Sequence, residues 1–232
     1  MNRIDHHDWH SRDYVSDWVA RSQPEDGRRL ARFQLMAQLI PHPKDAPVHI
    51  LDIGAGYGAL AKAMLDWFPK ARVVAQDYSD EMLGHARALL APYGDRVTFM
   101  QSDLMTTDWA RDLQGPFDAA VSSICIHNLQ DAPRIRQLYR EVRDLLSEGG
   151  CFLNVDLVNA PSRELQRTYW EVAAQSRLAR PDRRSAYGGD DWPPFQASVD
   201  DQLAWLREAG FHRVDCFWKE LGQALVGGYR QG

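Results

Sequence analysis

The sequence predicts an α/β fold built on a doubly wound, mostly parallel sheet of about seven strands that ends in an antiparallel hairpin. Short runs rich in β-branched residues alternate with segments whose apolar residues recur at helical spacing, which is the pattern of successive βαβ units. Only Leu221 and Gly222 separate the last two runs, a connection too short for parallel strands. With 232 residues, the chain is expected to form one domain.

Five strands and three helices are expected in the first two thirds of the chain. The strands are predicted at 48–53, 72–77, 96–103, 117–126 and 151–158, and the helices at 59–68, 79–94 and 131–147. Pro69 ends the first helix because proline cannot continue it, and Ser79 or Asp80 caps the second. Gly149 and Gly150 are expected to end the third helix.

The pattern changes after the fifth strand. From Asn159 to about Ser198 the chain is rich in aromatic residues and arginines, and we expect a lid or a wall over a ligand rather than part of the core. A final helix is expected at 200–209, followed by the two closing strands at 211–220 and 223–230.

Composition argues against several classes of protein. Apolar residues make up 44% and charged residues 25% of the chain, and no apolar run approaches the ~18 residues of a membrane span. The first residues lack the apolar core of a signal peptide, so a cytoplasmic protein is expected. A net charge of −5 argues against broad capture of nucleic acid. Cys125, Cys151 and Cys216 lack paired spacing and are expected to be reduced and buried.

A glycine-rich stretch, LDIGAGYG, follows the first predicted strand. Gly54, Gly56 and Ala59 fit the dinucleotide pattern G-x-G-x-x-G/A, and Asp77 ends the next strand about where an acid would bind a ribose. The same stretch also fits Asp-x-Gly-x-Gly-x-Gly, beginning at Asp52. In both patterns the glycines let backbone amides approach a ligand, which is a pyrophosphate in one and an amino acid in the other.

Further stretches distinguish these alternatives. In order along the chain, LDIGAGYG, AQDYSDEML, QSDLM, FDAAVSSICIHNL and the closing AGFHRVDCFWKELGQALVGGYR resemble the motifs of the class I S-adenosylmethionine-dependent methyltransferases. The resemblance runs from about Pro47 to the end of the chain. It implies a Rossmann-like fold, S-adenosyl-L-methionine as cofactor and S-adenosyl-L-homocysteine as product.

The resemblance also implies which residues contact the cofactor. Asp77 would bind both ribose hydroxyls, while the Asp103 carboxylate and the Leu104 amide would meet the adenine edge. The segment from Gly54 to Gly56 would approach the methionine moiety, and Asp52 would fix the loop or reach the ligand ammonium through water. The complete set of expected cofactor-binding residues is Tyr14, Asp52, Gly54, Ala55, Gly56, Asp77, Tyr78, Met82, Asp103, Leu104 and Ser122.

A dehydrogenase is the main alternative for the cofactor. A short-chain dehydrogenase needs Tyr-x-x-x-Lys, in which the lysine lowers the pKa of the tyrosine that transfers a proton. No tyrosine here is followed by lysine at that spacing, and the nearest match is Tyr139 with Arg143. The chain is also too short for a separate substrate domain, so a sulfonium cofactor is favoured over NAD.

A small molecule is the expected methyl acceptor, with an oxygen, nitrogen or sulfur nucleophile. Enzymes that methylate base amines carry Asn/Asp-Pro-Pro-aromatic after the fourth strand, where this chain reads SSICIHN. Cys125 follows Ile124 rather than proline, which argues against a cytosine C5 enzyme, and we find no two-glutamate loop for an arginine substrate. Two alternatives stay open: a tRNA-modification or carboxy-S-adenosylmethionine-type enzyme, and a non-enzymatic cofactor-binding module.

His127 is the candidate catalytic residue. It follows the fourth strand at the edge where open α/β folds bind ligands, and its imidazole has the chemistry of a base near neutral pH or of a group that orients an acceptor. Tyr14 and Trp18 are spaced for one face of an N-terminal helix that covers the site. The expected substrate-binding residues, which suit a carboxylated or aromatic acceptor, are Trp18, His127, Asn128, Tyr169, Trp170 and Trp192.

We expect neither a metal nor a membrane partner. His6, His7 and His10 lack an acidic or cysteine partner at ligand spacing and are expected to be solvated. The oligomeric state is left open, with a homodimer as one option. The expected organisation is an N-terminal helical lid at 1–46, a cofactor-binding core at 47–158, a substrate-side insertion at 159–198 and the last helix with the closing hairpin at 199–232.

Overall fold

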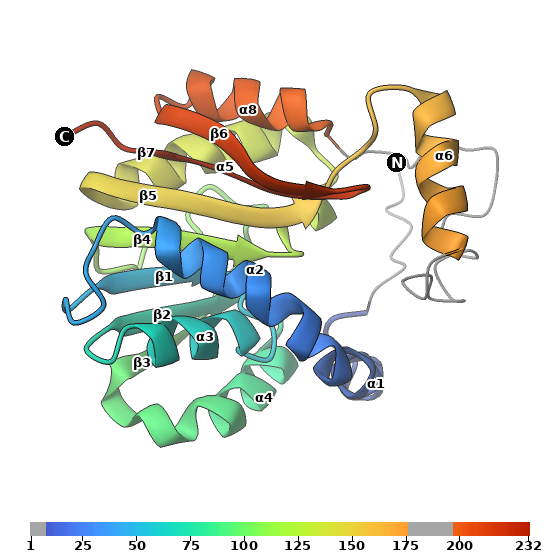
Figure 1. Cartoon of the computed structure of the whole chain (residues 1–232). Helices are drawn as coiled ribbons and strands as arrows, with labels where there is room; N and C mark the ends of the chain where they lie inside the picture. The colour runs from blue at the N-terminus through green and yellow to red at the C-terminus, as the bar shows by residue number, and fades with distance from the viewer. Residues whose placement is uncertain (1–7, 176–196) are drawn as a thin grey trace.

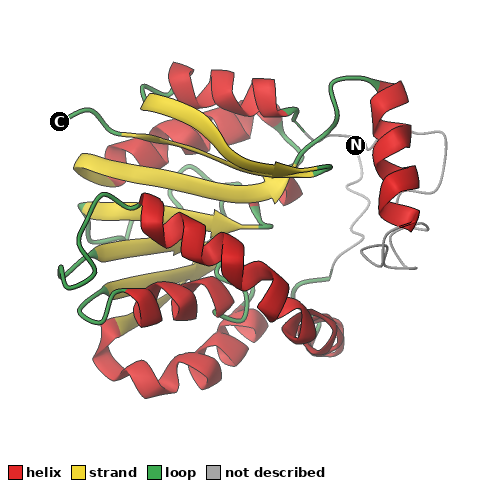
Figure 2. Cartoon of the chain, viewed as in Figure 1, coloured by secondary structure: helices red, strands yellow, loops and turns green. Residues whose placement is uncertain are grey.

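A computed structural model describes residues 8–175 and 197–232 of the chain, apart from the side chains at positions 25, 26 and 174. Its seven strands form one sheet in the order β3-β2-β1-β4-β5-β7-β6 (Figures 1 and 2). β7 runs antiparallel to both β5 and β6, and the other pairs are parallel, so the predicted fold class is confirmed. The strands are β1 (His49–Ile53), β2 (Arg72–Asp77), β3 (Val97–Gln101), β4 (Phe117–Ser123), β5 (Leu146–Leu157), β6 (His212–Glu220) and β7 (Gln223–Tyr229).

Helices cover both faces of the sheet (Figure 2). α2, α3 and α4 enclose one core, to which Met64 and Leu65 of α3 and the following Phe68 contribute, and α5 and α8 enclose the other, around Tyr139 and Phe152. The α-helices are α1 (Arg12–Ser22), α2 (Asp26–Leu39), α3 (Ala59–Trp67), α4 (Asp80–Leu90), α5 (Ala132–Leu145), α6 (Arg163–Gln175) and α8 (Val199–Glu208). Short 3₁₀ turns lie at η1 (Gln23–Glu25), η2 (Ala91–Arg96) and η3 (Ile126–Leu129).

Several predicted boundaries were wrong. The helix predicted at 79–94 ends at Leu90, and the strand predicted from Cys151 already begins at Leu146. β3 ends at Gln101 rather than near Asp103, and β4 ends at Ser123 because Ile124 takes a positive φ of 53°. α5 ends at Leu145, since Leu146 already has extended backbone and begins β5. The glycines expected to end the helix therefore lie inside the strand, where a Cβ on Gly150 would stand 3.0 Å from the carbonyl oxygen of Asp118.

The carboxyl ends of the central strands meet at one edge of the sheet. Ile53 of β1 pairs with Gln76 of β2 and with Ser122 of β4, while Ser123 pairs with Val155 of β5. α1 and α6 lie beyond this edge (Figure 1).

The division of the chain into lid, core, insertion and closing segment stays a prediction. Among the helices of the described ranges, none combines the length and apolar character needed to cross a membrane.

The close approach of β7 to β5 predicts a contrast between two glycines. A Cβ at Gly227 would stand 2.4 Å from the Phe152 carbonyl oxygen, whereas one at Gly84, on α4, would meet nothing within 4 Å. Gly227→Ala should therefore lower the free energy of unfolding by about 1–3 kcal/mol. Gly84→Ala should raise it by ~0.5–1 kcal/mol, because alanine favours helix. Urea unfolding followed by circular dichroism measures both, and equal effects would contradict this account of Gly227.

Candidate functional site

The glycine loop links the end of β1 to α3 in a conformation that other residues rarely adopt. Gly54, Gly56 and Gly58 have φ values of 66°, 56° and 91°. Gly54 is restricted further, because a Cβ there would stand 2.0 Å from the Sγ atom of Cys125. The loop is thus packed directly against the segment that follows β4, which carries His127.

Side chains of β2 hold this loop. The Gly54 N–H donates to Gln76 Oε1 at 3.1 Å, and Gln76 Nε2 donates to the Ser102 carbonyl at 2.8 Å. The Ala55 N–H donates to the Gln76 carbonyl at 2.8 Å. Gln76 is fully buried and links the loop to the end of β3. The sequence analysis missed this residue, although a buried amide directly before the candidate ribose acid was a usable signal.

Asp77 stands at the end of β2, as predicted. One carboxylate oxygen accepts the Gly56 N–H at 2.8 Å, and the other accepts the Ser79 N–H at 2.9 Å. Burial raises the pKa of Asp77, and these two amides together with the amide of Tyr78 oppose the rise. A carboxylate offers about four lone-pair directions, so Asp77 retains acceptor capacity for the two hydroxyls of a ribose.

Asp52 is completely buried beneath the loop. Neither of its carboxylate oxygens has a hydrogen-bond partner of ordinary geometry among the described residues. The pKa of Asp52 is raised to about 8. Burial is the main cause and the charge of Asp77 adds to it, whereas the nearby Ala61 amide opposes the rise. A buried acid without a partner is costly, and a cation bound at this loop would offset that cost.

The N-terminal segment packs over the same edge. Trp9 makes edge contacts with both Tyr14 and Trp18, at ring-centre distances of 5.3 and 5.6 Å, which confirms that these two side chains share a face of α1. Trp18 also lies 6.0 Å from the ring of Tyr57, in the glycine loop, and Met82 belongs to the same cluster. The structure therefore brings the predicted lid aromatics next to the glycine loop and α4.

Tyr78, one of the expected cofactor-binding residues, is largely exposed. Its side chain is 42% exposed, and the ring of His10 lies 4.4 Å from its ring centre. Ser79 donates its hydroxyl hydrogen to the Trp9 carbonyl and accepts the Met82 N–H, which caps α4. His10 is exposed, as expected, and its ring contacts that of Tyr78 at a tilt of 59°, whereas His6 and His7 lie outside the described residues.

Asp103 and Leu104 follow β3, close to the ends of β1 and β2. Asp103 Oδ1 accepts the Met105 N–H at 2.9 Å, and its carbonyl accepts the Thr106 N–H at 3.0 Å, so the chain turns here. The Leu104 carbonyl is bound by the side chain of Arg134. The residues expected at the adenine edge thus stand in a turn that other side chains hold in place.

His127 forms a pair with Asp156 that the sequence analysis did not predict. The ring Nδ1 lies 2.6 Å from Asp156 Oδ1, and the His127 backbone N–H donates to Asp156 Oδ2 at 2.9 Å. The side chains are 14% and 2% exposed. Nε2 has no partner among the described residues and carries the remaining lone pair or proton. An acid near the end of the last central strand, in NVDLV, was the available signal.

Cys125 lies between the loop and the His127–Asp156 pair. Burial raises the pKa of its thiol well above the usual range, and the charges of Asp77, Asp156 and Asp52 raise it further. A thiol held neutral in this way is a poor nucleophile. Its interpretation as a structural residue is favoured, although its side chain is partly exposed rather than buried.

The remaining predicted residues divide between the site and its surroundings. Ser122 is buried and donates its hydroxyl hydrogen to the Ile53 carbonyl at 2.9 Å. The backbone N–H of Asn128 closes the turn after β4 by donating to the Cys125 carbonyl. Tyr169, on α6, accepts a hydrogen bond from Lys219 Nζ at 2.9 Å and lies under that ammonium.

Trp170 lies on the same helix as Tyr169 and is partly buried, whereas Trp192 lies outside the described residues. Within the described ranges, no group of three or more His, Cys, Asp or Glu side chains is arranged to hold a metal ion. Cys151 is buried and Cys216 partly exposed, and neither is in a disulfide. The expectation that all three cysteines are buried therefore holds for Cys151 alone.

Comparisons with known proteins identify the family. The family described as "Methyltransferase domain" matches residues 50–150, from β1 into β5. The ubiquinone/menaquinone biosynthesis C-methyltransferase UbiE of Paracoccus denitrificans is 29% identical over 192 residues, 79% of this chain and 73% of its own length. These matches support a class I S-adenosylmethionine-dependent methyltransferase. They support S-adenosylmethionine as its cofactor and an enzyme rather than a non-enzymatic module.

Other relatives of the methyltransferase differ in the acceptors that their names give. A malonyl-[acyl-carrier protein] O-methyltransferase of Legionella pneumophila is 31% identical over 72% of this chain and 53% of its own length. A trans-aconitate 2-methyltransferase of Acidovorax ebreus is 30% identical over 73% of this chain and 57% of its own length. The chain thus spans little more than half of these two proteins.

Solved structures agree on the fold. An O-methyltransferase family protein from Burkholderia thailandensis superposes with a TM-score of 0.66 at 19% identity, covering 97% of this chain and 61% of that one. PigF, solved with S-adenosylhomocysteine, gives 0.68 at 17% identity, with coverage of 99% and 63%. The methyltransferase therefore has the fold of these proteins.

The residues at the glycine loop fit the cofactor of the family. The buried, unpartnered carboxylate of Asp52 suits a positively charged ligand, and Asp77 has acceptor capacity for a ribose. The absence of a side chain at Gly56, where a Cβ would meet nothing within 4 Å, leaves the backbone open to a ligand, whereas at Gly54 it makes room for Cys125.

The pKa of Asp52 predicts that cofactor binding releases a proton. With a pKa of about 8, roughly nine tenths of the empty sites carry a protonated Asp52 at pH 7. A bound cation favours the carboxylate, so binding lowers this pKa, and affinity should rise from pH 6 to about 8 and then level off. Calorimetry at pH 7 in two buffers of different ionisation enthalpy should show up to about one more proton released by wild type than by Asp52→Asn. Equal proton release by the two proteins would contradict this role for Asp52.

Proposed function

We propose that the methyltransferase transfers the methyl group of S-adenosylmethionine to a small-molecule acceptor that must lose a proton, with His127 as the general base. The single observation that carries the proposal is the His127–Asp156 pair, which leaves Nε2 without a partner among the described residues, beside the glycine loop. An imidazole fixed by a buried carboxylate is the arrangement that general-base catalysis needs.

The position of the pair supports its role. His127 lies two residues after Cys125, whose Sγ is in contact distance of Gly54, and Asp156 stands on β5 at the same edge of the sheet. Asp156 accepts three hydrogen bonds, from the ring and backbone of His127 and from the Leu157 amide. The carboxylate therefore fixes the ring plane, selects the tautomer with hydrogen on Nδ1 and stabilises the imidazolium that forms.

The proposed reaction is an in-line displacement. S-adenosylmethionine supplies a methyl group that is already activated by a positively charged sulfur. The protein holds the acceptor atom about 3 to 3.5 Å from that methyl group, in line with the bond that breaks. His127 Nε2 takes the proton of the acceptor as the new bond forms. Trp18, Tyr169 and Trp170 are proposed to wall the acceptor, because α1 and α6 both lie beyond the carboxyl edge of the sheet (Figure 1).

The proposed base favours one class of acceptor. A carboxylate acceptor has no proton to lose, so an oriented imidazole gives it no advantage. A hydroxyl or an N–H group gains nucleophilicity when Nε2 removes its proton. We therefore propose an acceptor that carries a phenol, another acidic hydroxyl or an N–H group, in preference to the free carboxylate that the name trans-aconitate 2-methyltransferase suggests for one relative.

A tRNA-modification or carboxy-S-adenosylmethionine-type enzyme is the second candidate, and the contacts of Arg29 bear on it. That function would need an arginine facing a cofactor carboxylate. Arg29 approaches the glycine loop, but its Nη1 donates to the Tyr57 hydroxyl at 3.3 Å and its Nη2 to the Ser22 carbonyl at 3.1 Å. These contacts use the guanidinium within the protein and support the small-molecule proposal.

Replacing either member of the pair tests the proposed base. His127→Ala should lower kcat about 10²–10⁴-fold with a phenolic acceptor and leave the Kd for S-adenosylhomocysteine nearly unchanged. Asp156→Asn should lower kcat in the same direction, because an amide does not stabilise the imidazolium. Formation of S-adenosylhomocysteine with catechol, 4-hydroxybenzoate and trans-aconitate as acceptors measures the effect. Turnover of trans-aconitate alone, with the same rate in His127→Ala, would exclude His127 as a base.

The ribose contact proposed for Asp77 has its own test. Asp77→Ala should weaken S-adenosylhomocysteine about 10- to 100-fold, since it removes a charged acceptor from two hydroxyls. Asp80→Ala is a matched control, because Asp80 is exposed and pairs with Arg87 in the next turns of α4. Calorimetry measures both variants, and undiminished binding by Asp77→Ala would contradict this contact.

A further inference from the structure

Arg134 and Glu141 form an ion pair on α5. Arg134, near the start of the helix, donates from Nη1 to Glu141 Oε1 at 3.0 Å and from Nη2 to Glu141 Oε2 at 2.7 Å. The two side chains are 8% and 16% exposed. Two parallel hydrogen bonds of this kind fix the guanidinium in both position and plane.

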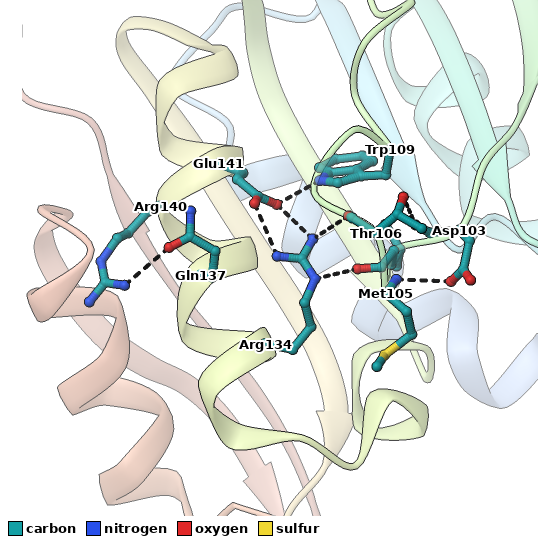
Figure 3. Close-up of polar contacts among 9 residues, drawn as sticks. Asp103, Met105, Thr106, Trp109, Arg134, Gln137, Arg140 and Glu141 are labelled. Atoms are coloured by element: carbon teal, nitrogen blue, oxygen red, sulfur yellow. Dashed lines mark hydrogen bonds and ion pairs between the residues drawn. The ribbon is translucent and has the colours of Figure 1, made fainter. Parts of the chain in front are cut away.

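This ion pair holds the segment that follows β3 (Figure 3). Arg134 Nε donates to the Leu104 carbonyl at 2.6 Å, and Nη2 donates to the Thr106 carbonyl at 3.1 Å. Glu141 Oε2 accepts the indole N–H of Trp109 at 2.7 Å. One pair on a rigid helix thus binds three points of an irregular segment.

The same segment also has polar groups that these contacts leave available. The Asp103 Oδ2 atom and the Leu104 N–H make no hydrogen bond with a described residue, whereas Asp103 Oδ1 and the Leu104 carbonyl are both occupied. An acceptor next to a donor is complementary to the amino group and the adjacent ring nitrogen of adenine.

We propose that Arg134 is a positioning residue for adenine recognition. By holding the carbonyls of Leu104 and Thr106, the Arg134–Glu141 pair keeps the Asp103 carboxylate and the Leu104 N–H directed at the adenine edge. A buried ion pair adds little net stability compared with apolar packing, but it fixes the direction of the groups that it binds. The inference rests on the cofactor contacts proposed for Asp103 and Leu104.

The test compares two ligands that differ at the adenine edge. S-inosylhomocysteine carries an oxygen in place of the amino group of S-adenosylhomocysteine and a hydrogen on the adjacent ring nitrogen, so it mismatches both Asp103 and Leu104. Wild type should prefer S-adenosylhomocysteine about 10- to 100-fold in calorimetry. Arg134→Lys keeps the charge but not the planar fork, and it should reduce this ratio of Kd values by roughly tenfold.

Two controls separate positioning from a general loss of structure. Arg140→Lys changes an exposed arginine of the same helix, which reaches Gln137 at 3.4 Å (Figure 3), and should leave the ratio unchanged. Asp77→Asn should weaken both ligands by the same factor, because the ribose is common to them. An unchanged ratio in folded Arg134→Lys would overturn the inference.

A milder variant covers the case in which Arg134→Lys does not fold. Trp109→Phe removes only the indole N–H that Glu141 accepts, and it should lower the ratio severalfold while circular dichroism stays that of wild type. A folded Trp109→Phe protein with the wild-type ratio would then overturn the inference. These binding measurements need no methyl acceptor. A failure of the enzyme to turn over any acceptor would therefore contradict only the proposed function. A failure of wild type to bind S-adenosylhomocysteine would contradict the cofactor contacts themselves.

Discussion

The contact between the glycine loop and the end of β2 is the constraint on which the rest of the site depends. The amides of Gly54 and Gly56 are bound by the side chains of Gln76 and Asp77, on the strand next to β1. Parallel pairing brings these side chains to the loop, and the absence of a Cβ lets the loop lie against Cys125. Every other group of the site is positioned relative to this backbone.

Negative charge dominates the interior of the site. Asp52, Asp77 and Asp156 all act on the thiol of Cys125, although they come from three different strands. Such a cluster is unfavourable in an empty protein, because the charge of Asp77 raises the pKa of Asp52 and all three charges raise the pKa of the Cys125 thiol. A sulfonium ligand with an ammonium group reverses this, since it brings positive charge into the same space. The electrostatics therefore favour a cationic cofactor over a pyrophosphate.

The sequence was informative where the signal was local. Strand and helix periodicity predicted the sheet and its closing hairpin, and the glycines with Asp77 predicted the loop, because each depends on neighbouring residues. The pairing of His127 with Asp156 could not be read in the same way, since 29 residues separate them and the register of β4 against β5 decides their contact. The early end of β4 was equally hard to predict, because Ile124, whose positive φ ends the strand, donates its N–H to the Val155 carbonyl on β5.

The hydroxyl of Ser79 joins the N-terminal segment to the first turn of α4, because it acts as a hydrogen-bond donor to one and as an acceptor for the other. Its hydrogen is donated to the Trp9 carbonyl, while its lone pair caps the helix through the Met82 N–H. Detachment of the N-terminal segment would break the first bond and leave the second intact. The attachment of the N-terminal segment and the cap of the helix are therefore separate functions of one side chain. An aspartate at this position would keep the cap but have no hydrogen to donate, so a single substitution separates the two functions.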